Sequence, residues 1–175
     1  YDQVIAVHIL ILGFATGRNL QSLLDLHRDS LQKHPIEDRE LLVTYKRRGW
    51  SSQATSIVAA ENESGKRMLT AIPANIGEHF RSLCAITSPL IEEAKVEDRN
   101  FVLLVRMQVR SKLNSGVVRF DGTRVARALR DFSKRHALVN DAGNPITLNM
   151  SRARPTFATE LYRRCRDIRK VKQAL

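Results

Sequence analysis

Apolar positions in the first part of the chain follow helical spacing. Residues 4–12 are almost all apolar, and a run with so few polar positions predicts a helix at the centre of the core. Gly17 is a plausible end for this helix. Asn19 can cap a second helix, in which Leu20, Leu23 and Leu24 recur at helical spacing.

The middle of the chain predicts a small antiparallel sheet. Residues 40–44 are typical of a short strand, and residues 54–60 are rich in β-branched side chains. We expect these two strands to form a hairpin around the polar turn YKRRGW, with the segment ENESGKR (61–67) as a loop. The apolar run 101–107 is interpreted as another short strand.

Helical spacing returns in residues 76–85 and 90–94, and again beyond residue 120. Asp121 or Thr123 can cap a helix with one apolar face, formed by Val125, Ala128, Leu129, Phe132 and His136. Two closing helices are expected to share an apolar stripe of Phe157, Leu161, Cys165, Ile168, Val171 and Leu175. The pattern therefore predicts a single α+β domain over residues 1–175, mainly helical with a small antiparallel sheet.

The net positive charge of the chain adds an indication of its binding partner. The chain has 175 residues, a net charge of +11 and an apolar fraction of 43%, which excludes global disorder. Residues 150–175 carry eight Arg and Lys against Glu160 and Asp167. A polyanionic partner, most commonly nucleic acid, is the leading explanation, with a basic surface of no specific role as the alternative.

Several kinds of chemistry find no support in the sequence. It contains no glycine-rich phosphate loop, no HExxH and no GxSxG, and its five histidines lack the spacing of metal ligands. We therefore expect neither a metal nor a cofactor. Cys84 and Cys165 are predicted to be buried free thiols in a reducing compartment. No apolar run has the length of a membrane span.

The remaining candidate chemistry is basic. Arg18, the turn Lys46-Arg47-Arg48, and Arg152 with Arg154 suit phosphodiester chemistry without a metal. Arginine forks can bind the non-bridging oxygens of a phosphate, and a lysine can protonate or stabilise a leaving oxygen.

The order of these segments resembles the catalytic domain of the tyrosine recombinases, or phage-type integrases. The matching segments are ATGRNLQSLLDL (15–26), LVTYKRRG (42–49), SRARPTFAT (151–159) and DIRKV (167–171). The resemblance implies cleavage and rejoining of DNA through a phosphotyrosine link, without metal or nucleotide cofactor.

Carried over residue by residue, the resemblance makes Arg154 the second catalytic arginine and Lys46 the hairpin lysine, with Arg47 and Arg48 as rivals for the latter role. At the place of the first arginine stands Asn19, with Arg18 one position earlier. Ser151 replaces the family's histidine, and Pro155 suits a helix start.

The resemblance also implies a nucleophilic tyrosine after Leu175, since the tyrosines present are Tyr1, Tyr45 and Tyr162. The chain is therefore expected to be a partial catalytic domain that does not cleave DNA by itself. We expect its parent to be a bacterial, cytoplasmic, DNA-associated integrase of a phage or mobile element, which self-associates on duplex DNA as a synapse. The expected backbone contacts are Arg47, Arg48, Arg124, Arg127 and Arg152.

Two other functions compete with this hypothesis. The first is a non-catalytic DNA-binding module that retains the recombinase fold, which Asn19 and Ser151 favour. The second is an RNA-binding domain, but an aromatic content of 6% leaves few rings for stacking platforms.

Overall fold

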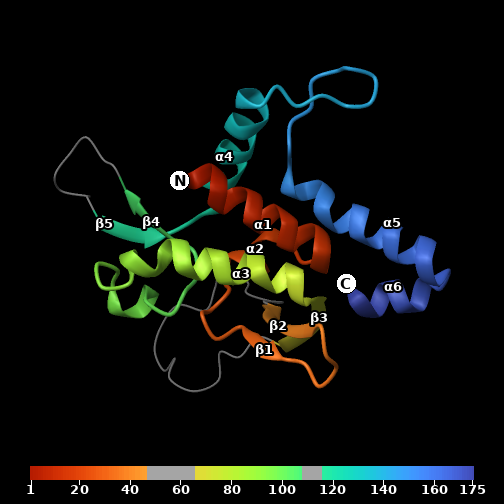
Figure 1. The fold of residues 1–175 in the computed structure, drawn as a ribbon, viewed down its shortest axis with the longest axis horizontal. Coiled ribbons are helices and arrows are strands. Elements are labelled where there is room, and N and C mark those ends of the chain that lie inside the picture. The colour runs from red at the N-terminus through yellow and green to blue at the C-terminus, as the bar shows by residue number, and fades with distance from the viewer. Residues whose placement is uncertain (47–65, 108–115) are drawn as a thin grey trace, which may run out of the picture.

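The computed structural model describes residues 1–46, 66–107 and 116–175 (Figure 1). Its helices are α1 (Asp2–Thr16), α2 (Leu20–Leu24), α3 (Ala74–Thr87), α4 (Gly122–Arg135), α5 (Ala153–Cys165) and α6 (Ile168–Ala174). Its strands are β1 (Leu31–Lys33), β2 (Arg39–Lys46), β3 (Lys66–Pro73), β4 (Leu104–Met107) and β5 (Gly116–Arg119). Short 3-10 helices are η1 (Ser88–Leu90), η2 (Val96–Asp98) and η4 (Met150–Arg152). The predicted fold class, mainly helical with small antiparallel sheets, is confirmed.

Helix α1 lies at the centre of the molecule, as its apolar pattern predicted. Ile5, Ile9 and Leu12 are fully or almost fully buried, and the helix contacts α3, α4 and α5 (Figure 1). It ends at Gly17, which adopts the left-handed conformation with φ 65° that glycine tolerates best. The predicted end of the helix is therefore confirmed.

The three-stranded sheet has the order β1-β2-β3 and is antiparallel throughout. In its register Leu42 lies opposite Thr70, and Lys46 lies opposite Lys66. Strand β2 pairs along its whole length with β3. Residues 54–60 lie outside the described part of the chain, and the predicted loop 61–67 gives its last two residues to β3.

Two further differences concern short elements. Residues 90–94 were expected to be helical, but η1 and a turn occupy this region, since Ser88-Pro89 begins a 3-10 helix. Leu90 and Ala94 still point inwards, where they pack with Leu104 and Val117 from the β4–β5 pair. Strand β4 confirms part of the strand expected in 101–107.

The last two helices form a corner. Helix α5 ends at Cys165, where Arg166 takes the left-handed conformation, and Asp167 caps α6 through the backbone N–H of Arg169. This corner interrupts the predicted apolar stripe. Val171 is buried, but Ile168 is 68% exposed, so its predicted inward position was wrong.

The thiols of Cys84 and Cys165 are free, as predicted, but half-buried rather than buried. Burial raises the pKa of the Cys84 thiol. Within the described ranges, no helix combines the length and the apolar character needed to cross a membrane.

Candidate active site

Close packing between α1 and the start of α5 brings together two segments that are far apart in the sequence. Gly13 lies against Met150 and Ala153, and Gly17 lies against the ring of Phe157. A Cβ atom at Gly13 would lie 2.7 Å from the end of the Met150 side chain, and one at Gly17 would collide with the Phe157 ring at 2.4 Å. Because Arg18 follows Gly17 and Arg154 follows Ala153, this packing places the two predicted arginines at the same end of α1.

Arg18 is almost completely buried, with 6% of its surface exposed. Its Nε and Nη2 both donate to the hydroxyl of Thr70 on β3, at 3.1 and 2.6 Å, and its Nη1 lies 3.4 Å from the sulfur of Met68. Burial, followed by repulsion from the positive charge of Arg154, lowers the pKa of Arg18 below its usual value.

Arg154 is half-buried in the first turn of α5. Its Nη2 donates to the backbone carbonyl of Leu175 at 3.1 Å, which joins α5 to α6. Within the described part of the chain, neither Arg154 nor Arg18 forms an ion pair with a carboxylate. Two like charges that lack an acidic partner are suited to share an anion.

Arg18 and Asn19 have different contacts. Asn19 is exposed and its side-chain oxygen accepts the backbone N–H of Ser22 at 2.8 Å, so it caps α2. Arg18 instead donates to Thr70 on β3. The role of either residue in catalysis stays a prediction.

Ser151 lies in η4, immediately before α5, and its side chain is exposed. Its backbone N–H donates to the side-chain oxygen of Asn149 at 2.9 Å. No hydrogen bond between described residues joins its hydroxyl to Arg18 or Arg154. Arg152, predicted to contact DNA, is also exposed in η4.

Lys46 is the last residue of β2. It lies four positions beyond Leu42, the residue opposite Thr70, which corresponds to about 13 Å along a strand. The hairpin strands thus carry both the predicted lysine and the contacts of Arg18. Arg47 and Arg48 lie outside the described residues.

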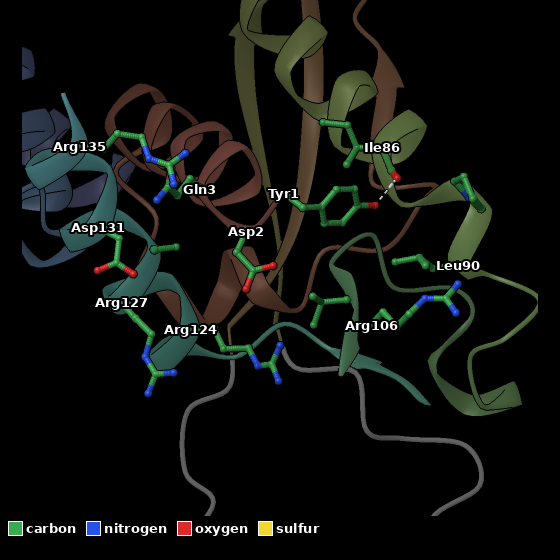
Figure 2. Close-up of a pocket in the computed structure, with 13 residues that line it drawn as sticks. Tyr1, Asp2, Gln3, Ile86, Leu90, Arg106, Arg124, Arg127, Asp131 and Arg135 are labelled. Carbon is green, nitrogen blue, oxygen red and sulfur yellow. Dashed lines mark hydrogen bonds between the residues drawn. The ribbon is translucent and has the colours of Figure 1, made fainter. Parts of the chain in front are cut away.

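A cavity of about 790 Å³ lies at the other end of α1 and takes in Arg124 and Arg127, both predicted to contact DNA. Arg124 is half-buried and lies 3.6 Å from the carboxylate of Asp121, whereas Arg127 is exposed. In Figure 2, Arg135 and Arg106 lie at opposite sides of this cavity, with Asp2 between them and Asp131 on the side of Arg135. Its positive charges are spread out, which suits an extended backbone better than a compact anion.

The predicted lack of a metal site stays a prediction. Among residues 1–46, 66–107 and 116–175, no group of three His, Cys, Asp or Glu side chains could hold an ion. His8 and His79 do meet, with 3.0 Å between their Nδ1 atoms, although they are far apart in sequence.

Sequence reasoning missed Thr70 and Met68, which hold the Arg18 side chain. Their contacts depend on which strand pairs with β2, and the pattern placed that strand at residues 54–60. The β-branched and apolar run MLTAI (68–72) was the available signal for a strand here.

Comparisons with known proteins bear on the fold. No protein-family model matches the chain, and no curated protein matches it either. Among solved structures, it is similar to the XerH site-specific recombinase bound to difH substrate in a pre-cleavage complex, with a TM-score of 0.58 and 14% identity. It is also similar to XerH bound to palindromic difH substrate in a post-cleavage complex, with a TM-score of 0.56 and 15% identity.

Both matches cover 99% of this chain, and the chain spans about 40% of the length of the first recombinase and 39% of the second. The chain therefore has a tyrosine recombinase-like fold. This confirms the structural part of the resemblance that its motifs indicated.

Proposed function

We propose that this chain binds duplex DNA, and that its full-length parent cleaves and rejoins DNA through a phosphotyrosine intermediate. The observation that carries the proposal is the packing of α5 on α1, which places Arg18 and Arg154 at the same end of α1, as partly or almost fully buried cations without an acidic partner among the described residues. Two buried cations without an acidic partner favour binding of an anion between them, because the attraction of each cation to the anion offsets their mutual repulsion.

The proposed roles follow from the chemistry of each side chain. Arg18 and Arg154 bind the non-bridging oxygens of the scissile phosphate, where negative charge develops in the transition state. Lys46 assists departure of the leaving oxygen. A tyrosine of the parent, expected after Leu175, attacks the phosphorus, and the resulting covalent link preserves the phosphodiester for rejoining.

The proposed DNA surface reaches from this site to the cavity at the other end of α1. Helix α1 has 15 residues and is about 22 Å long, so the cavity with Arg124 and Arg127 lies within one turn of duplex DNA, about 34 Å, from Arg154. We propose that one duplex contacts both ends, with Arg152, Arg47 and Arg48 as further backbone contacts. Site-specific recombination, self-association on DNA, and a bacterial cytoplasmic location in a phage or mobile element belong to the same proposal.

The experiment is covalent trapping with the full-length protein. A target site is first selected by binding from a random duplex library, and then offered as a nicked substrate that cannot be rejoined. The proposal expects a DNA–protein adduct that resists denaturation and maps to a tyrosine. Sequence-selective DNA binding without any covalent adduct would contradict the proposed cleavage through a phosphotyrosine intermediate.

A non-catalytic DNA-binding module is the second candidate, and Ser151 favours it. A serine in the position of the family's histidine cannot act as a general base at neutral pH. The same trapping experiment separates the two functions, because a module binds the selected duplex but forms no adduct.

A further inference from the structure

We propose that Thr70 on β3 is a positioning residue, which fixes the orientation of Arg18 for the scissile phosphate. This inference rests on the proposed function. Both Nε and Nη2 of Arg18 donate to the Thr70 hydroxyl, at 3.1 and 2.6 Å. Two donors on one oxygen fix the plane of the guanidinium group, which a single hydrogen bond does not.

The sheet makes Thr70 a rigid support. Thr70 lies opposite Leu42, which is fully buried, and both strands are paired throughout the antiparallel ladder. Met68 lies two positions away, on the same face of β3, and its sulfur receives Nη1 of Arg18 at 3.4 Å. Arg18 is therefore attached to the strand at three points.

Arg18 has N–H donors left over for a phosphate. A guanidinium group carries five N–H donors, and Thr70 and Met68 occupy three of them. One N–H on Nη1 and one on Nη2 have no partner among the described residues. A phosphate can accept both as a bidentate pair, which is the arrangement that arginine offers best.

The hydroxyl of Thr70 has a further advantage over a carboxylate in this position. As a neutral acceptor it orients Arg18 without cancelling its charge, so the full positive charge remains available to the phosphate. A carboxylate would neutralise the arginine and compete with the substrate. Removing the Thr70 hydroxyl should therefore affect the orientation of Arg18 rather than the charge of the site.

The test compares Thr70→Val with Thr70→Ser in the full-length protein, on the duplex selected for binding. Val keeps the branched shape but loses the acceptor, and Ser keeps the hydroxyl. We expect Thr70→Val to lower the single-turnover cleavage rate about 10-fold to 100-fold, as a small misplacement of a catalytic group does. The dissociation constant for DNA should change less than about 3-fold, because many phosphate contacts share the binding. Thr70→Ser should retain most of the cleavage rate.

Ala71→Val is the matched control. It introduces the same side chain at the next position of β3, where the residue is exposed, and it should cleave like the wild type. Thr70→Ala is a second variant that removes the hydroxyl without adding a methyl group in its place. If Thr70→Val does not fold, Thr70→Ala replaces it in the test, and its cleavage rate should fall by the factor expected for Thr70→Val.

The outcomes separate this inference from the proposed function. If the wild type cleaves and Arg18→Ala does not, while Thr70→Val and Thr70→Ala cleave at the wild-type rate, the positioning role is overturned and the proposed function stands. Equal loss of cleavage in Thr70→Ser would also overturn it, since the hydroxyl would then not be the important group. If the wild type forms no adduct, the proposed function fails and the positioning role fails with it.

Discussion

Arg18 and Asn19 are neighbours in the sequence, yet Arg18 donates to Thr70 on β3, whereas Asn19 caps α2. The backbone around them sets the direction of each side chain: Gly17 turns the chain in the left-handed conformation, and the Asn19 side chain caps α2. Sequence alone identified Arg18 and Arg154 as candidates because their residue types and order matched a pattern. It chose Arg18 although Arg18 stands one position before the family's arginine, where Asn19 lies, and it could not show which contacts each side chain makes.

A prediction at this scale concerns Gly17, whose backbone has φ 65° and whose missing Cβ makes room for the ring of Phe157. Gly17→Ala adds both backbone strain and a collision. We expect it to lower the free energy of unfolding by about 2 to 4 kcal/mol in chemical denaturation. It should also weaken DNA binding, because Phe157 belongs to the helix that carries Arg154.

Gly143→Ala is the matched control. Gly143 has φ 77°, but a Cβ there would meet no atom within 4 Å. The Gly143→Ala variant therefore has the backbone strain without the collision, and its free energy of unfolding should fall by only about 1 kcal/mol. Equal losses in the two variants would contradict the view that Gly17 joins α1 to α5 by close packing.

Among the elements, the long helices were predictable, and several of the strands were not. The patterns of α1, α3 and α4 are amphipathic or strongly apolar over many residues, so they define their helices without help from the rest of the fold. Strands β1 and β5 have three and four residues, and neither was predicted. Segments so short acquire their structure from pairing with a neighbour, which a linear pattern does not contain.

The contact between α1 and α3 gives a prediction on pH. The helices run antiparallel, since Tyr1 donates to the carbonyl of Ile86 (Figure 2) while His8 meets His79. Burial, followed by repulsion from His79, lowers the pKa of His8 below its usual value of about 6.5. The unfolded chain then binds the proton more tightly than the folded one, so the free energy of unfolding falls as the pH drops below about 6.5.

The measurement is chemical denaturation between pH 8 and pH 5. The wild type should lose stability through this range, and His8→Gln should lose less, because glutamine carries no titratable charge. The values at pH 8, where the His8 of the wild type is neutral, serve as the reference for each variant. An unchanged pH dependence in His8→Gln would contradict a contribution from this pair.

At the scale of the whole molecule, a net charge of +11 indicated a polyanion but not where it binds. The fold separates the candidate positions: Arg18 and Arg154 lie at one end of α1, and Arg124 and Arg127 line the cavity at the other. This separation could not be predicted from the sequence, because it depends on how α4 and α5 pack around α1 (Figure 1).

The prediction at this scale is a steep dependence of DNA affinity on salt, with little dependence on sequence for the backbone contacts. Arg124→Ala with Arg127→Ala should weaken binding of any duplex and reduce the slope of log K against log salt by up to about 2. Lys33→Ala is the control, since Lys33 is exposed on the short strand β1 of the sheet. Salt-insensitive binding, or an equal change of slope in the control, would contradict the proposed surface.

If Arg154 binds the scissile phosphate, its removal should abolish cleavage while the protein still folds and binds DNA. Arg154→Ala in the full-length protein is assayed for covalent trapping on the selected duplex, alongside wild type and with circular dichroism as a check of the fold. We expect the variant to fold and to bind duplex DNA, while the covalent adduct is lost. An Arg154→Ala protein that forms the adduct at the wild-type rate would show that Arg154 does not bind the scissile phosphate.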